Sequence, residues 1–158
     1  ARQGGALTAT CRSIPEAVSA MLLREANRMI RIEHLALWTP DLERLAAFYA
    51  DVFGAAVGER YENAAHGFAS RFLTFASGSR LELMQTAELD LAMAPPGAQR
   101  LGLTHLALSL GSAEAVDTLT AGLRDRGCPV LDGPRWTGDG YYESTVLDPD
   151  GNRLELTI

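Results

Sequence analysis

The chain has 158 residues, of which 47% are hydrophobic and 22% are charged, a composition typical of a soluble globular protein that forms one compact unit. No apolar run approaches the roughly 18 residues that cross a bilayer, so we expect no membrane insertion. The formal net charge of −6, without lysine or any basic cluster, argues against nucleic acid as a partner, because phosphate binding needs concentrated positive charge. Cys11 and Cys128 are too few for a disulfide framework, which favours a reducing, cytoplasmic compartment.

Residues 1–29 are interpreted as an N-terminal extension, because no later stretch repeats them. Ser13-Ile14-Pro15 opens a pattern with apolar residues on one helical face, which predicts a helix in this extension. Carboxylates at Glu16 and Glu25, and the lack of a continuous apolar core, distinguish the segment from a secretory or transit peptide.

Residues 30–86 predict a βαβββ module. Its first strand is expected at 30–38, where side chains alternate between two faces. An amphipathic helix follows, with Thr39 as its N-cap, Pro40 as its first residue and Gly54 at its end. Three further strand-like runs complete the module, at residues 55–62, 68–76 and 79–86.

Residues 87–100 are the expected linker, since they contain Pro95-Pro96-Gly97 and no firm periodicity. The second module, residues 101–158, repeats the order of the first, with a helix between Ser112 as N-cap and Gly127. Residues 148–151 (Asp-Pro-Asp-Gly) predict a turn before the last strand, because proline presets φ and glycine accepts positive φ. The strands of this module are expected at about 102–110, 129–135, 140–147 and 152–158.

Two four-residue stretches occur in both modules. Residues 34–37 (His-Leu-Ala-Leu) return 71 residues later as 105–108, and residues 80–83 (Arg-Leu-Glu-Leu) return 73 residues later as 153–156. This recurrence indicates an internal duplication. Because side chains alternate between the faces of a strand, the leucines share one face, which can pack on the helices. The opposite face carries the polar residues of the repeats, His34, Glu82, His105 and Glu155.

A lone histidine or glutamate in a strand is more often a structural or solvated residue than a metal ligand. The duplication favours metal ligation instead, because two of the three histidines and two glutamates fall at matching positions. Two such modules would form a curved mixed sheet cup with a polar interior and with helices on the outer face. We therefore predict an α+β fold and a site for one divalent metal ion, for which imidazole and carboxylate ligands suit Ni, Zn, Co, Mn or Fe.

With a histidine near the start of the first strand and a glutamate in the last strand of each module, residues 30–158 resemble a single domain of the vicinal oxygen chelate family, the glyoxalase and bleomycin-resistance superfamily. The most specific likeness is in residues 148–156, which are similar to the closing turn and ligand strand of that family. The resemblance implies a metal site of the glyoxalase I type, a small-molecule substrate and a homodimer. The implied metal ligands are His34, Glu82, His105 and Glu155.

Two imidazoles and two carboxylates leave two octahedral positions for neighbouring substrate oxygens. These positions favour enolate or enediolate chemistry, with Glu82 or Glu155 moving a proton between adjacent carbons. The resemblance implies a lyase or isomerase that acts through such an intermediate. The resemblance implies a hemithioacetal of an α-oxoaldehyde as the first substrate to test. One alternative is a ligand-sequestering protein of the bleomycin-resistance type, which needs no metal. Another is a metal-dependent dioxygenase, which a fourth protein ligand disfavours.

Several side chains are candidates for the substrate pocket. Arg80 and Arg153 share the strand face of the expected ligands and are candidate receptors for a carboxylate, ahead of Arg71 and Arg135. Residues 83–86 (Leu-Met-Gln-Thr) depart from the aromatic and amide residues that follow the equivalent glutamate in glyoxalase I, which leaves the substrate open. His66, in a loop, is expected at the surface. The remaining pocket candidates are Trp38, Met84, Trp136, Tyr141 and Tyr142.

Overall fold

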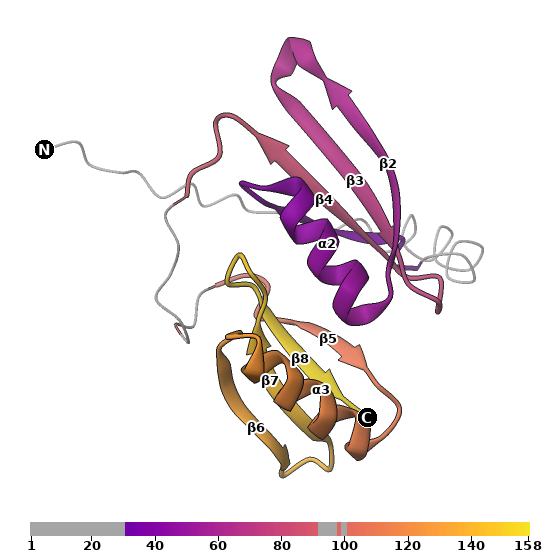
Figure 1. Cartoon of the computed structure of the whole chain (residues 1–158), viewed down its shortest axis with the longest axis vertical. Helices are drawn as coiled ribbons and strands as arrows, with labels where there is room; N and C mark the ends of the chain where they lie inside the picture. The colour runs from indigo at the N-terminus through magenta and orange to yellow at the C-terminus, as the bar shows by residue number, and fades with distance from the viewer. Residues whose placement is uncertain (1–30, 92–97, 99–100) are drawn as a thin grey trace, which may run out of the picture. The chain divides into compact units, whose positions relative to one another are not determined.

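The computed structural model describes residues 31–91, 98 and 101–158 and divides the chain into two units, Ala1–Glu33 and His34–Ile158 (Figure 1). Both repeated modules lie in the second unit. The helix predicted within residues 1–29, and residues 92–97 and 99–100 of the predicted linker, lie outside the described residues. In the described part of the chain, no helix is long and apolar enough to cross a membrane.

The first module is a four-stranded mixed sheet with a helix packed on one face. Its strands lie in the order β1 (His34–Trp38), β4 (Arg80–Thr86), β3 (Phe68–Thr74) and β2 (Ala56–Asn63). β1 runs parallel to β4, and the other neighbours are antiparallel. The helix, α2 (Leu42–Phe53), follows β1, and a short 3₁₀ helix, η1 (Ala64–His66), joins β2 to β3.

The second module repeats this arrangement. Its strands lie in the order β5 (Leu106–Ser109), β8 (Arg153–Thr157), β7 (Tyr142–Leu147) and β6 (Val130–Trp136), and β5 runs parallel to β8. Its helix, α3 (Ala113–Asp125), follows β5. The predicted α+β fold of two tandem βαβββ modules is confirmed. Across the described residues the two sheets remain separate, since no strand of one pairs with a strand of the other.

The first strand of each module is shorter than predicted. β1 begins at His34 and not at residue 30, and β5 spans Leu106–Ser109 and not 102–110. In each module the strand begins where its parallel partner supplies backbone hydrogen bonds, since His34 pairs with Arg80 and Leu106 with Leu154. Apolar alternation continues beyond these points in the sequence, but a strand needs a neighbour to satisfy its backbone groups.

The predicted caps are correct for α3 and wrong for the start of α2. The Ser112 side chain accepts a hydrogen bond from the Ala115 N–H at 3.2 Å, as expected of an N-cap. The N-cap of α2 is Asp41, whose carboxylate accepts from the Arg44 N–H at 3.1 Å. The hydroxyl of Thr39 accepts from the Asp41 N–H at 3.1 Å instead, so a local threonine turn delays the helix past Pro40.

Both helices end at the glycines that the sequence predicts as their stops. Gly54 closes α2 in the left-handed conformation, at φ 66°. Gly127, at φ 82°, comes directly after Arg126, the C-cap of α3. Glycine adopts positive φ without a Cβ clash, which explains why both helices stop there.

The leucines of the repeated stretches face the helices and form the core. Those in β4 and β8 are at most 2% exposed, and those of β1 and β5 are partly buried against the same cluster. The face assignment made from alternation is therefore correct, and it directs the polar residues of the same strands away from the helices. The leucines concerned are Leu35, Leu37, Leu81, Leu83, Leu106, Leu108, Leu154 and Leu156.

The two modules contact each other through α2 and the turn that precedes β8. The buried Tyr49 hydroxyl donates to Asp148 Oδ2 at 3.1 Å. Arg44 forms an ion pair with Asp150 and donates to the Pro149 carbonyl at 3.3 Å. Asp148 also accepts from the backbone N–H groups of Asp150, at 2.9 Å, and Asn152, at 2.8 Å, which confirms the predicted turn. Burial raises the pKa of the Asp148 carboxyl, although these hydrogen bonds act in the opposite direction.

Candidate metal centre

A histidine and a glutamate meet on the helix-free face of the first sheet. Parallel pairing places Ala36 of β1 opposite Glu82 of β4, so His34, two residues before Ala36, lies diagonally across from Glu82 on the same face. The two side chains are 3.6 Å apart, from His34 Nε2 to Glu82 Oε2, and are 36% and 19% exposed.

The second module contains the same pair in the same register. Ala107 of β5 lies opposite Glu155 of β8, and His105, two residues earlier, reaches Glu155 diagonally. His105 Nε2 is 3.4 Å from Glu155 Oε2, and the side chains are 37% and 21% exposed. The Thr104 hydroxyl lies 3.1 Å from His105 Nδ1 and can orient the imidazole. The duplication thus extends from the sequence to the relative placement of the side chains.

The donor atoms of each pair fit two neighbouring positions around a divalent ion. Ligands about 2.1 Å from a metal and at right angles to each other lie about 3 Å apart, close to the separations in the two pairs. No group of three or more His, Cys, Asp or Glu side chains that could hold a metal is present among residues 31–91, 98 and 101–158. Each pair is therefore half of the four-ligand set expected from the sequence.

One aromatic ring lies beside the pair in the first module. The Phe72 ring, in β3 opposite Glu82, stands edge-on to His34, with ring centroids 5.3 Å apart. The Arg80 guanidinium lies 4.3 Å from the centroid of the same ring. The sequence pattern predicts Phe72 only as part of a strand. Its alternation with Phe68 and its antiparallel pairing were the signals that place it beside the His34–Glu82 pair.

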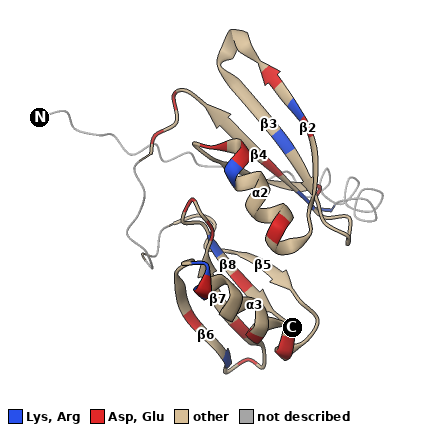
Figure 2. Cartoon of the chain, in the orientation of Figure 1, with Lys and Arg blue, Asp and Glu red and all other residues tan. Residues whose placement is uncertain are grey.

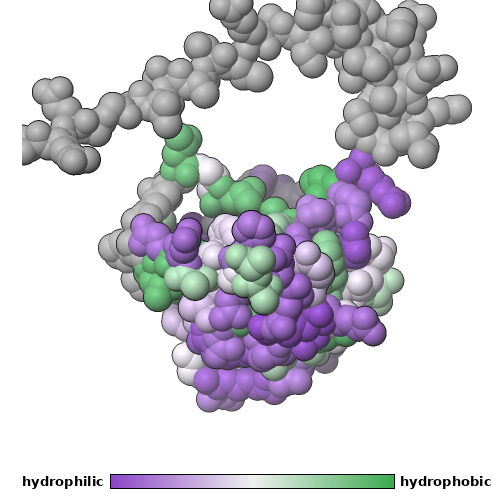
Figure 3. All heavy atoms as spheres, turned by 90° about the horizontal axis from the view of Figure 1, so that it is seen from above, coloured by the Kyte–Doolittle hydropathy of each residue, from purple (hydrophilic) through white to green (hydrophobic). Residues whose placement is uncertain are grey.

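Further aromatic residues extend along this sheet. Trp38 makes an edge-on contact with Phe68 at 6.3 Å, and Phe68 lies 6.2 Å from Tyr61. Met84, another predicted pocket residue, is the β4 partner of Trp38. Trp38 is 48% exposed and Tyr61 57% exposed, and Figure 3 shows hydrophobic groups among hydrophilic ones on the face in view. The structure thus places Trp38 and Met84 in the strands that carry the His34–Glu82 pair.

Two predicted pocket residues of the second module lie on the opposite face from Glu155. The Tyr142 hydroxyl donates to Asp117 of α3 at 2.7 Å, so its side chain is on the helix side of the sheet. Trp136 pairs with Tyr142 across β6 and β7, and their ring centroids are 5.2 Å apart. Alternation explains the difference, because Thr145, and not Tyr142, is the β7 residue opposite Glu155. Arg153, by contrast, shares the parity of Glu155 in β8.

The remaining candidates have local structural roles. Arg71 donates to the Gly58 carbonyl at 2.7 Å and to Glu43 of α2, which places it on the helix side. Arg135 forms an ion pair with Asp132. His66 ends the exposed η1, as expected. Tyr141 is 53% exposed and lies before β7.

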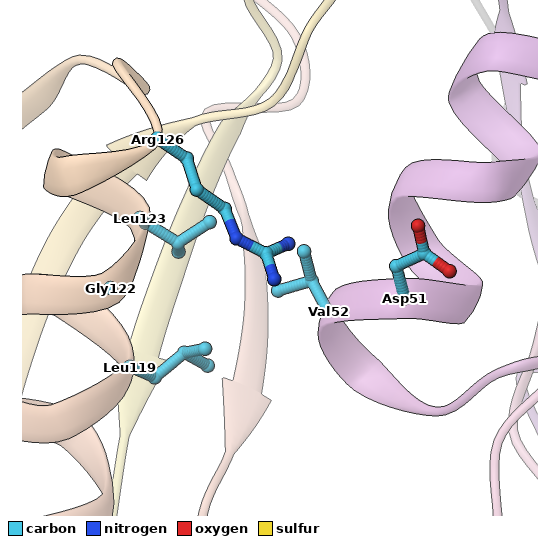
Figure 4. Close-up of a pocket in the computed structure, with 6 residues that line it drawn as sticks. All are labelled: Asp51, Val52, Leu119, Gly122, Leu123 and Arg126. Carbon is cyan, nitrogen blue, oxygen red and sulfur yellow. The ribbon is translucent and has the colours of Figure 1, made fainter.

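A small cavity of about 110 Å³ lies between α2 and α3 and is separate from the four expected ligands. Figure 4 shows the Arg126 side chain extending from the end of α3 toward Val52, with Asp51 beside it on α2. The cavity therefore lies on the helix side of the sheets. Its lining residues are Asp51, Val52, Leu119, Gly122, Leu123 and Arg126.

The family of the chain follows from its sequence and agrees with this geometry. Residues 31–156 match the model of the Glyoxalase/Bleomycin resistance protein/Dioxygenase superfamily. The chain belongs to this superfamily. The match includes both modules and all four residues of the two pairs, so the predicted family resemblance is confirmed.

Curated relatives and solved structures agree with this membership. The mitochondrial methylmalonyl-CoA epimerases of Bos taurus and Homo sapiens are 36% and 34% identical to the chain over 64 residues, which are 40% of this chain and 36% of each relative. The chain thus matches little more than a third of their length. A glyoxalase/bleomycin resistance protein/dioxygenase domain from Frankia sp. EAN1pec has a TM-score of 0.69 at 18% identity, covering 82% of this chain and 98% of that one. The trypanothione-dependent glyoxalase I of Leishmania major has a TM-score of 0.63 at 23% identity, covering 81% and 86%. These structural likenesses show the superfamily fold.

Proposed function

We propose that this superfamily member is a metal-dependent lyase or isomerase that acts on a small substrate with vicinal oxygens. The observation that carries the proposal is the repeated His–Glu pair, with donor atoms 3.6 Å apart in one module and 3.4 Å apart in the other. Two unrelated structural requirements would have no reason to produce the same pair twice in the same register. A shared metal site requires both pairs.

His34 and His105 would hold the ion as neutral imidazoles, and Glu82 and Glu155 would complete the set as carboxylates. When bound, the ion would polarise two neighbouring substrate oxygens and so favour removal of a proton from the adjacent carbon. Glu82 or Glu155 would take this proton and return it to the neighbouring carbon. The Phe72 ring beside His34 would exclude water from this side of the site.

The site would close between two copies of the chain. Neither pair has a third metal-ligating side chain beside it among the described residues, so each needs the other pair. In a two-fold symmetric dimer, the His34–Glu82 pair of each copy would face the His105–Glu155 pair of the other, which gives two equivalent sites. A homodimer is therefore part of the proposal.

Complementation between two inactive variants tests this arrangement. Chains with Glu82→Gln and chains with Glu155→Gln are co-expressed with different tags, and the heterodimer is purified. Shared sites leave one site of the heterodimer intact and the other doubly altered, so about half of the wild-type activity and one ion per dimer are expected. Both homodimeric variants serve as controls. Sites closed within single chains would leave the heterodimer as inactive as the controls, which would overturn the shared site.

The first substrate to test is the hemithioacetal of methylglyoxal and glutathione, with metal content measured on protein purified without chelator. The likeness to methylmalonyl-CoA epimerases adds an acyl thioester with an exchangeable α-proton. Failure to turn over either substrate with the metal-loaded dimer, together with no exchange of a substrate proton for deuterium, would contradict the proposed chemistry.

A ligand-sequestering function is the second candidate, and the exposed aromatic side chains Trp38 and Tyr61 favour it. Such a function would use these rings to bind a planar compound without metal chemistry. Metal analysis separates the two candidates. Stoichiometric metal that is lost in His34→Ala supports the enzyme, whereas metal-free protein that binds planar compounds supports sequestration.

A further inference from the structure

One carboxylate on the pair face of the second module has no counterpart in the first. Thr145 of β7 lies opposite Glu155, and Glu143, two residues earlier, lies opposite Thr157. Glu143 is thus a diagonal neighbour of Glu155 on the same sheet face, about 7–8 Å away by ordinary strand geometry. In the first module Phe72 lies opposite Glu82, so the position that corresponds to Glu143 is occupied by Ser70.

The Glu143 carboxylate forms no ion pair or hydrogen bond in the described part of the chain. Its cross-strand neighbour is Arg135, but the Arg135 guanidinium donates to Asp132. Glu143 is partly buried, and burial, followed by the charge of Glu155, raises the pKa of its carboxyl. Arg135 acts in the opposite direction, and Asp139 and Asp132 reinforce the shift. Figure 2 shows acidic and basic residues along this module.

A carboxylate in this place costs stability, because it is partly removed from water and lies near a second carboxylate. The charge of Arg135 offsets part of this cost, but no ion pair or hydrogen bond among the described residues holds the Glu143 carboxylate, and serine fills the equivalent position of the duplicate without such a cost. Residues that break local structural rules without compensation cluster at functional sites. The position of Glu143 beside the His105–Glu155 pair indicates which site it belongs to.

We propose that Glu143 is a specificity-determining residue that accepts a hydrogen bond from the substrate group next to the metal-bound oxygens. The inference rests on the proposed function, since it assumes that substrate lies against this sheet face. A protonated amine would bind best, a hydroxyl or hydrogen less well, and a carboxylate would be rejected by charge. The first module carries Ser70 at the equivalent position and has no carboxylate there, so the substrate would bind in one orientation.

Three catechols test this selectivity, because they share vicinal oxygens and a planar ring and differ in the charge of one substituent. Dopamine is cationic, 4-methylcatechol neutral and 3,4-dihydroxyphenylacetate anionic. Their dissociation constants are measured by calorimetry on the zinc-loaded protein at pH 8 and low salt, without oxygen, with zinc content checked after each titration. For the wild type we expect affinity to fall in this order, by about tenfold between the cation and the anion.

Glu143→Gln keeps the size of the side chain and removes its charge. The ratio of the dissociation constants of the anionic and the cationic catechol should therefore fall to about twofold or less. The matched control is Asp125→Asn at the exposed end of α3, which should keep the wild-type order. Equal binding of all three catechols by the wild type, or an unchanged ratio in Glu143→Gln, would overturn the role of Glu143.

The experiments distinguish failure of the proposed function from failure of the role of Glu143. If the catechols bind in the expected order of charge but no hemithioacetal or acyl thioester is turned over, the proposed enzymatic activity is contradicted. Glu143 then still selects the bound ligand by its charge. Turnover without a charge order contradicts only the selectivity of Glu143. Circular dichroism and thermal unfolding of Glu143→Gln establish that the variant is folded, and removal of an unpaired carboxylate should leave its melting temperature unchanged or higher.

Discussion

The two modules carry the same His–Glu pair on sheet faces with different surroundings. In the first module, the Phe72 ring adjoins the pair, edge-on to His34, and Arg80 lies over the same ring. In the second, the corresponding strand carries Thr145 opposite Glu155 and Glu143 nearby. The donor geometry is therefore the part that both copies share, and the neighbouring strands are the part that differs. The shared part suits a metal ion, and the divergent part suits recognition of an asymmetric substrate.

The largest expected effect comes from removing a carboxylate of the shared part. Glu155→Gln should reduce turnover by about 10²–10⁴-fold, because it removes both a proposed metal ligand and a candidate proton carrier. Glu82→Gln is the equivalent change in the first module. A larger fall in kcat for one variant than for the other, at equal metal loading, identifies the residue that moves the proton. Wild-type turnover in both variants would contradict the site.

Core substitutions at equivalent positions test whether the modules unfold together. Leu83 and Leu156 are both fully buried, so Leu83→Ala and Leu156→Ala should each lower the free energy of unfolding by about 2–5 kcal/mol. A single unfolding transition, shifted by either change, is expected because Tyr49 and Asp148 join the modules. Calorimetry of both variants checks this, and two separate transitions would show independent modules.

The contact between the modules should depend on pH through Asp148. Burial raises its folded-state pKa above the ordinary value of 3.8. Proton binding to this carboxyl therefore stabilises the folded state relative to the unfolded state. The stabilising contribution is present below about the ordinary pKa and decreases as pH rises through the folded-state pKa. Asp148→Asn should remove this dependence, so its stability relative to wild type should rise with pH across that window. Urea unfolding of both proteins at several pH values measures the difference, and parallel pH profiles would contradict it.

The smallest expected effect is a difference in ligand affinity between variants of the two tryptophans. Trp38 contacts Phe68 in the first module, whereas Trp136 lies with Tyr142 on the helix side of the second. Trp38→Leu should weaken binding of 4-methylcatechol by about threefold to tenfold, in line with one lost aromatic contact. Trp136→Leu should leave binding unchanged and is the matched control. Equal effects of the two substitutions on binding would contradict a contact between Trp38 and the ligand.

Alternation and repetition in the sequence were sufficient for most of the fold and for the composition of each pair. A period of two fixes which side chains share a face, so the leucines and the His and Glu residues were assigned correctly without coordinates. The same rule places Tyr142 on the opposite face from Glu155, but only after the register of β7 against β8 is known. Register depends on hydrogen bonds between distant segments, which explains the errors at Tyr142 and Trp136.

Two βαβββ modules, their apolar faces and two candidate His–Glu pairs were predictable from the sequence, because these depend on local periodicity and on a duplicated pattern. The start of β1 at His34, the Asp41 cap of α2 and the place of Glu143 diagonally across from Glu155 became known only from the folded chain. Those features depend on which backbone and charged groups meet across strands far apart in sequence. The same dependence makes the two pairs separate halves in the described chain, although their sequences are alike.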